Sequence, residues 1–201
     1  MSFMSRYAAI RFALYFLLVA GFFQAAVLQA KHVGPLTVFR EGGFAETFQL
    51  LCALVTAISL LLLARKYKSH EGLLVCFSAL ALLASVRELN NTELYRVIFF
   101  FPGASWFFGL ALLGYLIWRF RDGLPGQIQD FLGMPASFLF ASGGIIITAW
   151  AQVFAQAPLF RTYEADRIVE EGLEAAGYLL ILCGVEELSI NLNPAGDQEP
   201  V

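Results

Sequence analysis

The stretch EEGLEAAGYLLILCGVEE, residues 170–187, decides what kind of fold this chain can adopt. Only 11 uncharged residues separate Glu174 from Glu186. As a helix they would cover about 16 Å, whereas the hydrocarbon core of a membrane is about 30 Å thick. A helix that crosses a membrane here must therefore carry carboxylates into it. Ionised groups in hydrocarbon are costly unless they are paired, protonated or hydrated, so the segment predicts a polar site between packed helices.

The composition of the whole chain indicates an integral membrane protein. Of the 201 residues, 59% are hydrophobic and only 14% are charged. Soluble domains carry about 25% charged residues and lack repeated apolar stretches of nearly membrane length. The net charge is only −3 and the basic residues are scattered, which argues against nucleic acid as a partner. We expect membrane lipids as partners, and the sequence also allows a homo-oligomer or a membrane complex.

Long uncharged runs predict an all-α fold, namely a polytopic membrane helix bundle with about six transmembrane helices. All six belong to a single transmembrane domain, residues 1–190. The expected spans cover about residues 8–30, 45–64, 71–90, 97–118, 135–157 and 167–187. The remaining tail, residues 191–201, contains proline and acids and is expected to be disordered.

Two compact basic clusters predict the orientation of the bundle. Arg65–Lys68 and Arg119–Arg121 each follow directly after an expected span, and such clusters favour the cytoplasmic side. With an even number of spans, both termini are then cytoplasmic. We expect the protein in the plasma membrane of a bacterium, that is, the inner membrane.

Polar residues gather at the opposite, extracytoplasmic face in this arrangement. Spans two and six begin there, and spans three and five end there. The residues concerned are Glu46 and Gln49 in span two, Arg87 and Glu88 in span three, and Arg167, Glu170, Glu171 and Glu174 in span six. Because helical spacing turns them to one side of each helix, we predict one shared polar pocket, in which Arg87 pairs with a glutamate of another helix.

The residue types in this predicted pocket indicate roles. Paired carboxylates can divide acid and base roles between them, so Glu46 and Glu174 are the candidate catalytic residues, and one or the other is the base. An arginine can hold a phosphate or a carboxylate, which is the role expected of Arg87. The candidate substrate-binding residues are Gln49, Arg87, Glu88, Arg167, Glu170 and Glu171.

Two further expectations concern neighbouring segments. Small and hydroxyl residues at helical spacing predict a helix–helix seam on span five, formed by Ser137, Ala141, Gly144, Thr148 and Gln152. Glu186 and Glu187, at the other end of span six, are expected to be interfacial and solvated.

Metal-binding signals are weak. The cysteines Cys52, Cys76 and Cys183 lie in apolar runs, and neither His32 nor His70 stands at metal-ligand spacing from them. A zinc site is therefore not expected. The acidic pocket could hold Mg²⁺ or Ca²⁺, which prefer oxygen ligands. The sequence identifies no other cofactor.

Three short motifs resemble those of uncharacterised bacterial multispanning membrane proteins. Residues 41–49, EGGFAETFQ, resemble an E-x-G-x-x-E-x-x-Q motif, residues 87–88 an R-E motif, and residues 170–177, EEGLEAAG, an E-E-x-x-E-x-x-G motif. The chain departs from that pattern at residues 89–91, LNN, where S-W-G is frequent. The resemblance covers most of the chain and implies a multispanning membrane protein, without implying a reaction.

Three functions follow from these features. The first is binding or processing of a lipid headgroup or a lipid-linked substrate at the polar pocket. The second is a structural or assembly subunit, in which the polar network fixes the register of the helices. The third is a proton- or cation-coupled transporter, which is disfavoured by the Leu-, Ile- and Val-rich opposite halves of the spans.

Overall fold

A computed structural model of the chain describes residues 3–39, 43–90, 102–156 and 163–193, and within these residues it contains helices and no strand. The helices are α1 (Phe3–Val33), α2 (Pro35–Phe39), α3 (Phe44–Lys66), η1 (Lys68–His70), α4 (Glu71–Asn90), α6 (Pro102–Phe120), α7 (Leu124–Leu132), α8 (Pro135–Ile145), η2 (Ile146–Trp150), α9 (Ala151–Gln156) and α10 (Tyr163–Leu192). The predicted all-α fold is confirmed for this part of the chain.

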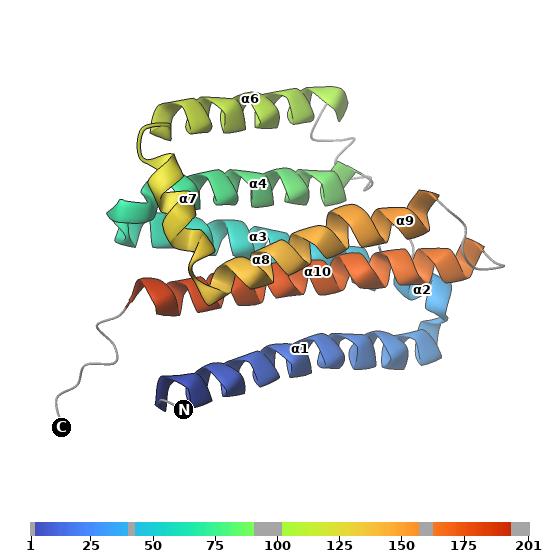
Figure 1. Cartoon of the computed structure of the whole chain (residues 1–201). Helices are drawn as coiled ribbons and strands as arrows, with labels where there is room; N and C mark the ends of the chain where they lie inside the picture. Colours follow the sequence, from blue (N-terminus) through green and yellow to red (C-terminus); the bar gives the residue numbers. More distant parts are fainter. Residues whose placement is uncertain (1–2, 40–42, 91–101, 157–162, 194–201) are drawn as a thin grey trace.

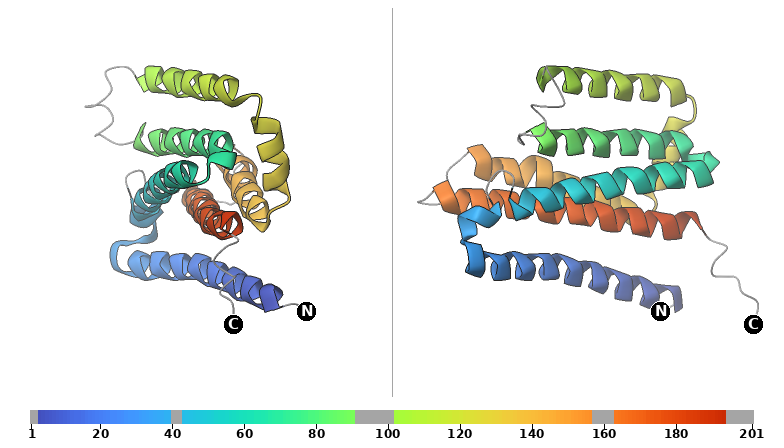
Figure 2. Two further views of the ribbon diagram at one scale, coloured as in Figure 1. Left: turned by 90° about the vertical axis from the view of Figure 1, so that its left-hand side faces the viewer. Right: turned by 180° about the vertical axis from the view of Figure 1, so that it is seen from behind.

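The long helices lie roughly along one axis, with α1, α4 and α8 running in one direction, α3, α6 and α10 in the opposite one, and α10 in the middle (Figure 1). Helices α1, α2, α3, α8, η2 and α9 all contact α10. Helix α6 lies outermost and packs on α4 (Figure 2). We call the end of the bundle where α3 and α10 begin the carboxylate end. We call the opposite end, where α1 begins and α10 finishes, the termini end.

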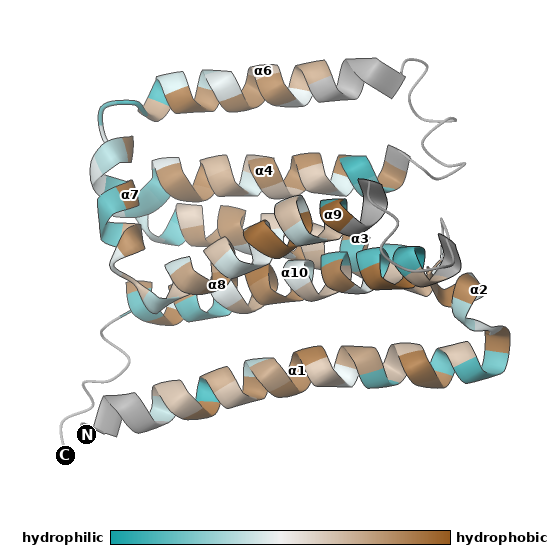
Figure 3. Cartoon of the chain, turned by 45° about the vertical axis from the view of Figure 1, so that its right-hand side comes forward, coloured by the Kyte–Doolittle hydropathy of each residue, from teal (hydrophilic) through white to brown (hydrophobic). Residues whose placement is uncertain are grey.

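Within the described part of the chain, four helical segments are long and apolar enough to cross a membrane. They are Tyr7–Val33, the segment Pro35–Lys66 that contains α3, Lys68–Leu89 and Pro135–Val153. These agree with the expected spans one, two, three and five. Figure 3 shows hydrophobic residues along most of α1 and α6, and hydrophilic ones on α7 and at the start of α10.

The other two expected spans differ from this pattern. The apolar segment Phe107–Phe120 in α6 is shorter, and residues 97–101 of the expected span lie outside the described residues. Helix α10 has 30 residues and is therefore long enough, but it is not among these four apolar segments. It also extends to Leu192, into the expected tail, whose residues 194–201 lie outside the described part.

A short helix that sequence reasoning missed, α7, lies across the termini end (Figure 2). Its Gln127 side-chain oxygen accepts a hydrogen bond of 2.8 Å from the backbone N–H of Leu73, in the first turn of α4, where no backbone partner exists. Its Phe131 joins the apolar core formed by Leu60, Leu74 and Leu188. The termini half of the bundle is thus packed by apolar side chains.

The expected seam on span five is wrong in its phase. Ala141 and Thr148 are exposed, and Thr148 donates its hydroxyl to the carbonyl of Gly144 in its own helix at 2.7 Å. The buried residues of α8 and η2 are Ala136, Leu139, Gly143 and Ile147. At Gly143 a Cβ atom would lie 2.6 Å from the carbonyl oxygen of Gly177 in α10. The two backbones therefore approach closely at a pair of glycines, as small residues permit in membrane bundles.

Candidate functional site

Two buried glutamates from different helices share one arginine at the carboxylate end. Arg87 in α4 donates from Nε to Oε1 of Glu88 at 2.9 Å, and its Nη2 contacts Oε2 of Glu174 in α10. The glutamate side chains are 5% and 7% exposed, whereas that of Arg87 is 34% exposed. The predicted pairing of Arg87 with a glutamate of another helix is therefore confirmed, with Glu174 as the partner.

Two further residues complete this cluster, which we call the carboxylate centre: Arg87, Glu88, Glu174, Tyr178 and Gln152. The hydroxyl of Tyr178 donates to Oε1 of Glu88 at 2.8 Å, and the residue lies one helical turn after Glu174 in α10. The amide of Gln152 in α9 donates to Oε1 of Glu174 over 3.5 Å, which is a long hydrogen bond. Three helices thus supply the polar groups of the carboxylate centre.

The π-helical turn η2, between α8 and α9, affects where Gln152 points. A π turn contains more residues than an α turn, so it changes the phase of the residues that follow. Ile147, inside this turn, is buried and packs where Gly177 leaves room on α10. Such turns occur often at functional sites. Here the turn precedes the residue that reaches Glu174.

A second set of contacts lies one turn toward the start of α10. The carboxylate of Glu171 accepts from Nη2 of Arg167 at 2.8 Å and from the amide of Gln49 in α3 at 2.9 Å. The same amide nitrogen donates to the backbone carbonyl of Glu171 at 3.1 Å. Because these two bonds fix the amide orientation, the other side-chain atom of Gln49 is its oxygen acceptor.

That oxygen, Oε1 of Gln49, has no hydrogen-bond partner among the described residues, although the side chain is fully buried. The hydroxyl of Thr56, two turns further along α3, is in the same situation. Buried acceptors without donors are rare in folded proteins. The inner face of α3 therefore offers polar atoms that a ligand or a water molecule could satisfy.

Two further predicted site residues lie near these clusters. Glu46 is buried one turn before Gln49 on the same face of α3. Glu170 is half-buried and lies close enough to Arg167 and Arg87 for a favourable electrostatic interaction with both. Among the contacts described above, Glu88 is the carboxylate that shares Arg87 with Glu174.

A third polar cluster, at the termini end, was not expected. Glu187 accepts from Nε and Nη2 of Arg11 at 2.9 and 2.8 Å and from the hydroxyl of Tyr15 at 3.2 Å. Its side chain is 1% exposed, so the expectation that Glu187 is solvated is wrong, whereas Glu186 is exposed. Helical phase could have shown this, because Glu187 lies four residues after the buried Cys183.

Metal binding has little support in the described residues. They contain no group of three or more histidine, cysteine, aspartate or glutamate side chains arranged to hold a metal ion. Glu88, Glu171 and Glu174 already accept hydrogen bonds from arginine or glutamine. A divalent cation at the carboxylate centre would have to displace Arg87.

A comparison of the chain with protein-family models, curated proteins and solved structures finds no match. The likeness to uncharacterised bacterial membrane proteins stays a prediction from the three motifs.

Proposed function

We propose that the protein is a six-span integral membrane protein that binds or processes a lipid headgroup or a lipid-linked substrate at the carboxylate centre. The observation that carries this proposal is the sharing of one guanidinium by two buried carboxylates. One positive and two negative charges leave a formal net charge of −1 in this triad. Buried charge without full compensation is costly, which makes the triad suited to take up a proton or a cationic group.

The surroundings of α10 support its assignment as a sixth span. Its buried glutamates face arginines and polar groups of neighbouring helices, so they need not contact lipid.

Helix α6, with 19 residues, would cover about 28 Å and so nearly match the hydrocarbon core. Six spans place both termini on one side, which agrees with the shared position of the first turn of α1 and the last turn of α10 (Figure 1). We place that side in the cytoplasm of a bacterial cell.

In this proposal the residues of the carboxylate centre have separate tasks. The excess negative charge of the triad holds a cationic group of the headgroup, and Arg87, one third exposed, fixes the two carboxylates. Glu174 receives or donates the proton, and Glu88, fixed by Arg87 and Tyr178, keeps the guanidinium in place. Glu46, Gln49, Arg167, Glu170 and Glu171 form the surrounding wall at the same end.

The test compares two glutamate variants of the gently purified protein by native mass spectrometry and lipid analysis. Glu174→Gln keeps the shape of the side chain but removes its charge, and we expect it to lose a lipid or lipid-linked molecule that the unaltered protein retains. Glu186→Gln, at an exposed carboxylate of the same helix, is the matched control and should retain that molecule. Equal retention by both variants would contradict a ligand site at Glu174.

A structural role is the second candidate, favoured by the dense pairing of the buried groups. Arg87, Glu88, Glu171 and Glu174 all have hydrogen-bond partners, which would fix the register of α3, α4 and α10. This role predicts that no ligand is retained by any variant. Transport has less support, because the termini half of the bundle is packed by apolar side chains that include the fully buried Leu60, Leu74 and Leu188.

A further inference from the structure

Helix α1 is attached to the rest of the bundle less tightly than the other long helices near α10. Among its membrane-facing residues, Phe16, Leu17 and Val27 are at least half exposed. Apolar contact alone does little to hold a helix to a bundle in lipid, because lipid chains are equally apolar. The buried ion pair of Arg11 with Glu187 fixes α1 at the termini end. Toward the carboxylate end, a hollow remains between α1 and α10.

This hollow, which we call the α1 pocket, has a volume of about 500 Å³ and nearly apolar walls. Its walls include Phe23, Val27 and Ala30 of α1, Phe39 of α2, and Gly172 and Leu173 of α10. Gly34, with a φ of 89°, reverses the chain after α1, a conformation that glycine adopts without strain. That turn brings α2 against the end of the pocket. The pocket and the carboxylate centre lie on opposite sides of α10.

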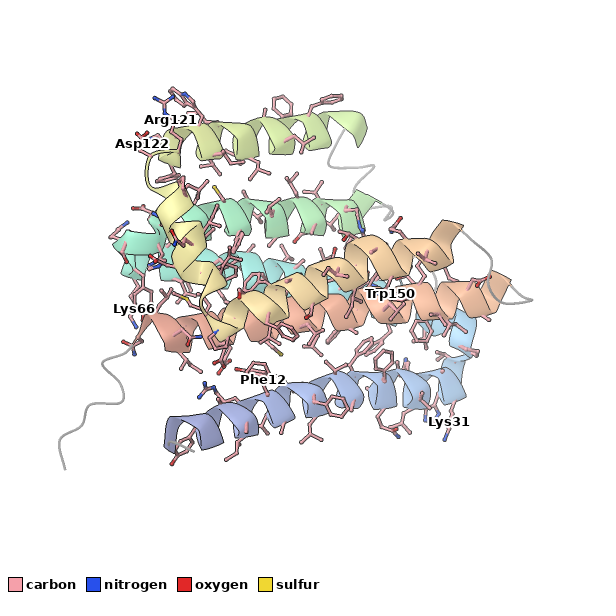
Figure 4. The ribbon with its side chains drawn as sticks, in the orientation of Figure 1. Phe12, Lys31, Lys66, Arg121, Asp122 and Trp150 are labelled. Carbon is pink, nitrogen blue, oxygen red and sulfur yellow. The ribbon has the colours of Figure 1, made fainter. Side chains whose placement is uncertain are left out.

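Lys31 lies at the rim of the α1 pocket, in the last turn of α1. Figure 4 shows its side chain projecting from the end of that helix. Within the described residues it makes no hydrogen bond or ion pair, so its ammonium group is available. From Phe23 to Lys31 the helix rises about 12 Å, close to the depth of one leaflet, about 15 Å. The apolar walls thus lie at the depth of acyl chains and the cation at that of headgroups.

We propose that the α1 pocket binds one anionic phospholipid, with an acyl chain along the apolar walls and the phosphate at Lys31. An apolar hollow that opens to the bilayer is filled by the only apolar molecules present, which are lipids. The unpaired lysine selects among them by charge, as basic residues near a membrane surface do. This inference does not depend on the function proposed for the carboxylate centre.

A second hollow on the other flank of α1 provides an internal comparison. It has a volume of about 640 Å³, lies between α1, α3 and α10 in the termini half, and has Glu186 as the charged residue in its wall. A carboxylate at the rim repels an anionic headgroup. The two hollows therefore predict opposite preferences for lipid charge at the two ends of α1.

The test uses a phosphatidylglycerol probe that carries a diazirine in its acyl chain, added to phosphatidylcholine nanodiscs that contain the full-length protein. After illumination, mass spectrometry maps the labelled residues. We expect labels on residues 23–30 and 168–173. A choline-headed probe with the same acyl chain should label these residues about fivefold less, the factor expected for loss of one charge interaction at the membrane surface.

Two matched pairs of variants sharpen this experiment. Lys31→Gln should lower phosphatidylglycerol labelling about fivefold, whereas Lys66→Gln, at the opposite end of the bundle, should not change it (Figure 4). Val27→Trp should fill the pocket and remove most of the label, whereas Leu28→Trp, which is equally exposed and does not line the pocket, should leave it unchanged. Both pairs lie at exposed positions, so all four variants should fold.

Three results would overturn the proposal. Labelling spread evenly over α1 and α6 would show contact with bulk lipid only. Equal labelling by the glycerol- and choline-headed probes would show that the pocket does not select an anionic headgroup. Labelling concentrated on the hollow beside Glu186 would show that the preference lies at the other end of α1.

Discussion

Both ends of α10 bury glutamates against arginines, but they balance charge differently. At the termini end, Glu187 forms a two-bond ion pair with Arg11 and accepts a further hydrogen bond from the neutral Tyr15, so the two charges cancel. At the carboxylate end, Arg87 forms ion pairs with both Glu88 and Glu174, and one negative charge is in excess. An ion pair with no net charge is suited to holding helices together, whereas a triad with an excess negative charge is suited to binding a proton or a cationic ligand. The comparison separates a structural contact from a candidate site within one helix.

The largest effect is expected at the shared arginine. Arg87→Ala leaves two buried carboxylates without their counter-charge, and removing one member of a buried pair typically costs about 3–5 kcal/mol. We expect a large fall in the thermal unfolding temperature in detergent. Arg119→Ala, at an exposed arginine in the last turn of α6, is the control and should have little effect. Equal and small effects would show that water already compensates the charges around Arg87.

Arg11→Ala tests the ion pair of Arg11 with Glu187. It should lower the free energy of unfolding by about 3 kcal/mol, the lower end of the same range, because only one buried carboxylate loses its counter-charge. The hydroxyl of Tyr15 continues to donate to Glu187. The loss should also free α1, which can be followed by the rate at which a protease cuts near its start. A variant that is as destabilised as Arg87→Ala, or that leaves α1 as protected as before, would weaken the comparison.

A tyrosine donates to a glutamate in both clusters, which allows a direct comparison of single hydrogen bonds. Tyr178→Phe removes a 2.8 Å bond to a glutamate in the negatively charged triad, and we expect a loss of about 1.5–3 kcal/mol. Tyr15→Phe removes a longer bond of 3.2 Å from a carboxylate that Arg11 already neutralises, and about 0.5–1.5 kcal/mol should be lost. Thermal unfolding of the two variants measures the difference. The reverse order would contradict the assignment of excess charge to the carboxylate end.

The smallest effect on stability is expected for Glu174→Gln, at about 1 kcal/mol or less. This change removes the excess negative charge, and Arg87 keeps Glu88 as its partner. Glu187→Gln removes the single partner of Arg11 and should destabilise the protein more. If Glu174→Gln unfolds at a lower temperature than Glu187→Gln, the assignment of excess negative charge to the carboxylate centre is wrong.

Much of the site could be predicted from helical spacing and helix direction. The directions of successive helices brought Arg87 and Glu174 to one end of the bundle, and spacing placed Glu46, Gln49 and Thr56 on one buried face of α3. The failures have a common cause, which is helix rotation. The seam of α8 lies at Gly143 rather than at Gly144, and Glu187 turns inward beside the exposed Glu186. A rotation by one residue changes which neighbour faces the interior.

The sequence by itself determined that the chain is helical and apolar, and that its last helix carries carboxylates at both ends of a short apolar run. Length and charge are properties of the chain, and they hold in any arrangement of the helices. Only the tertiary structure decided which carboxylates share an arginine and which have one of their own. Pairing depends on the rotation of each helix, on the π turn before Gln152 and on the close contact of α8 with α10 at Gly143 and Gly177. These features arise when helices pack, because side-chain contacts between helices far apart in the sequence select one rotation for each.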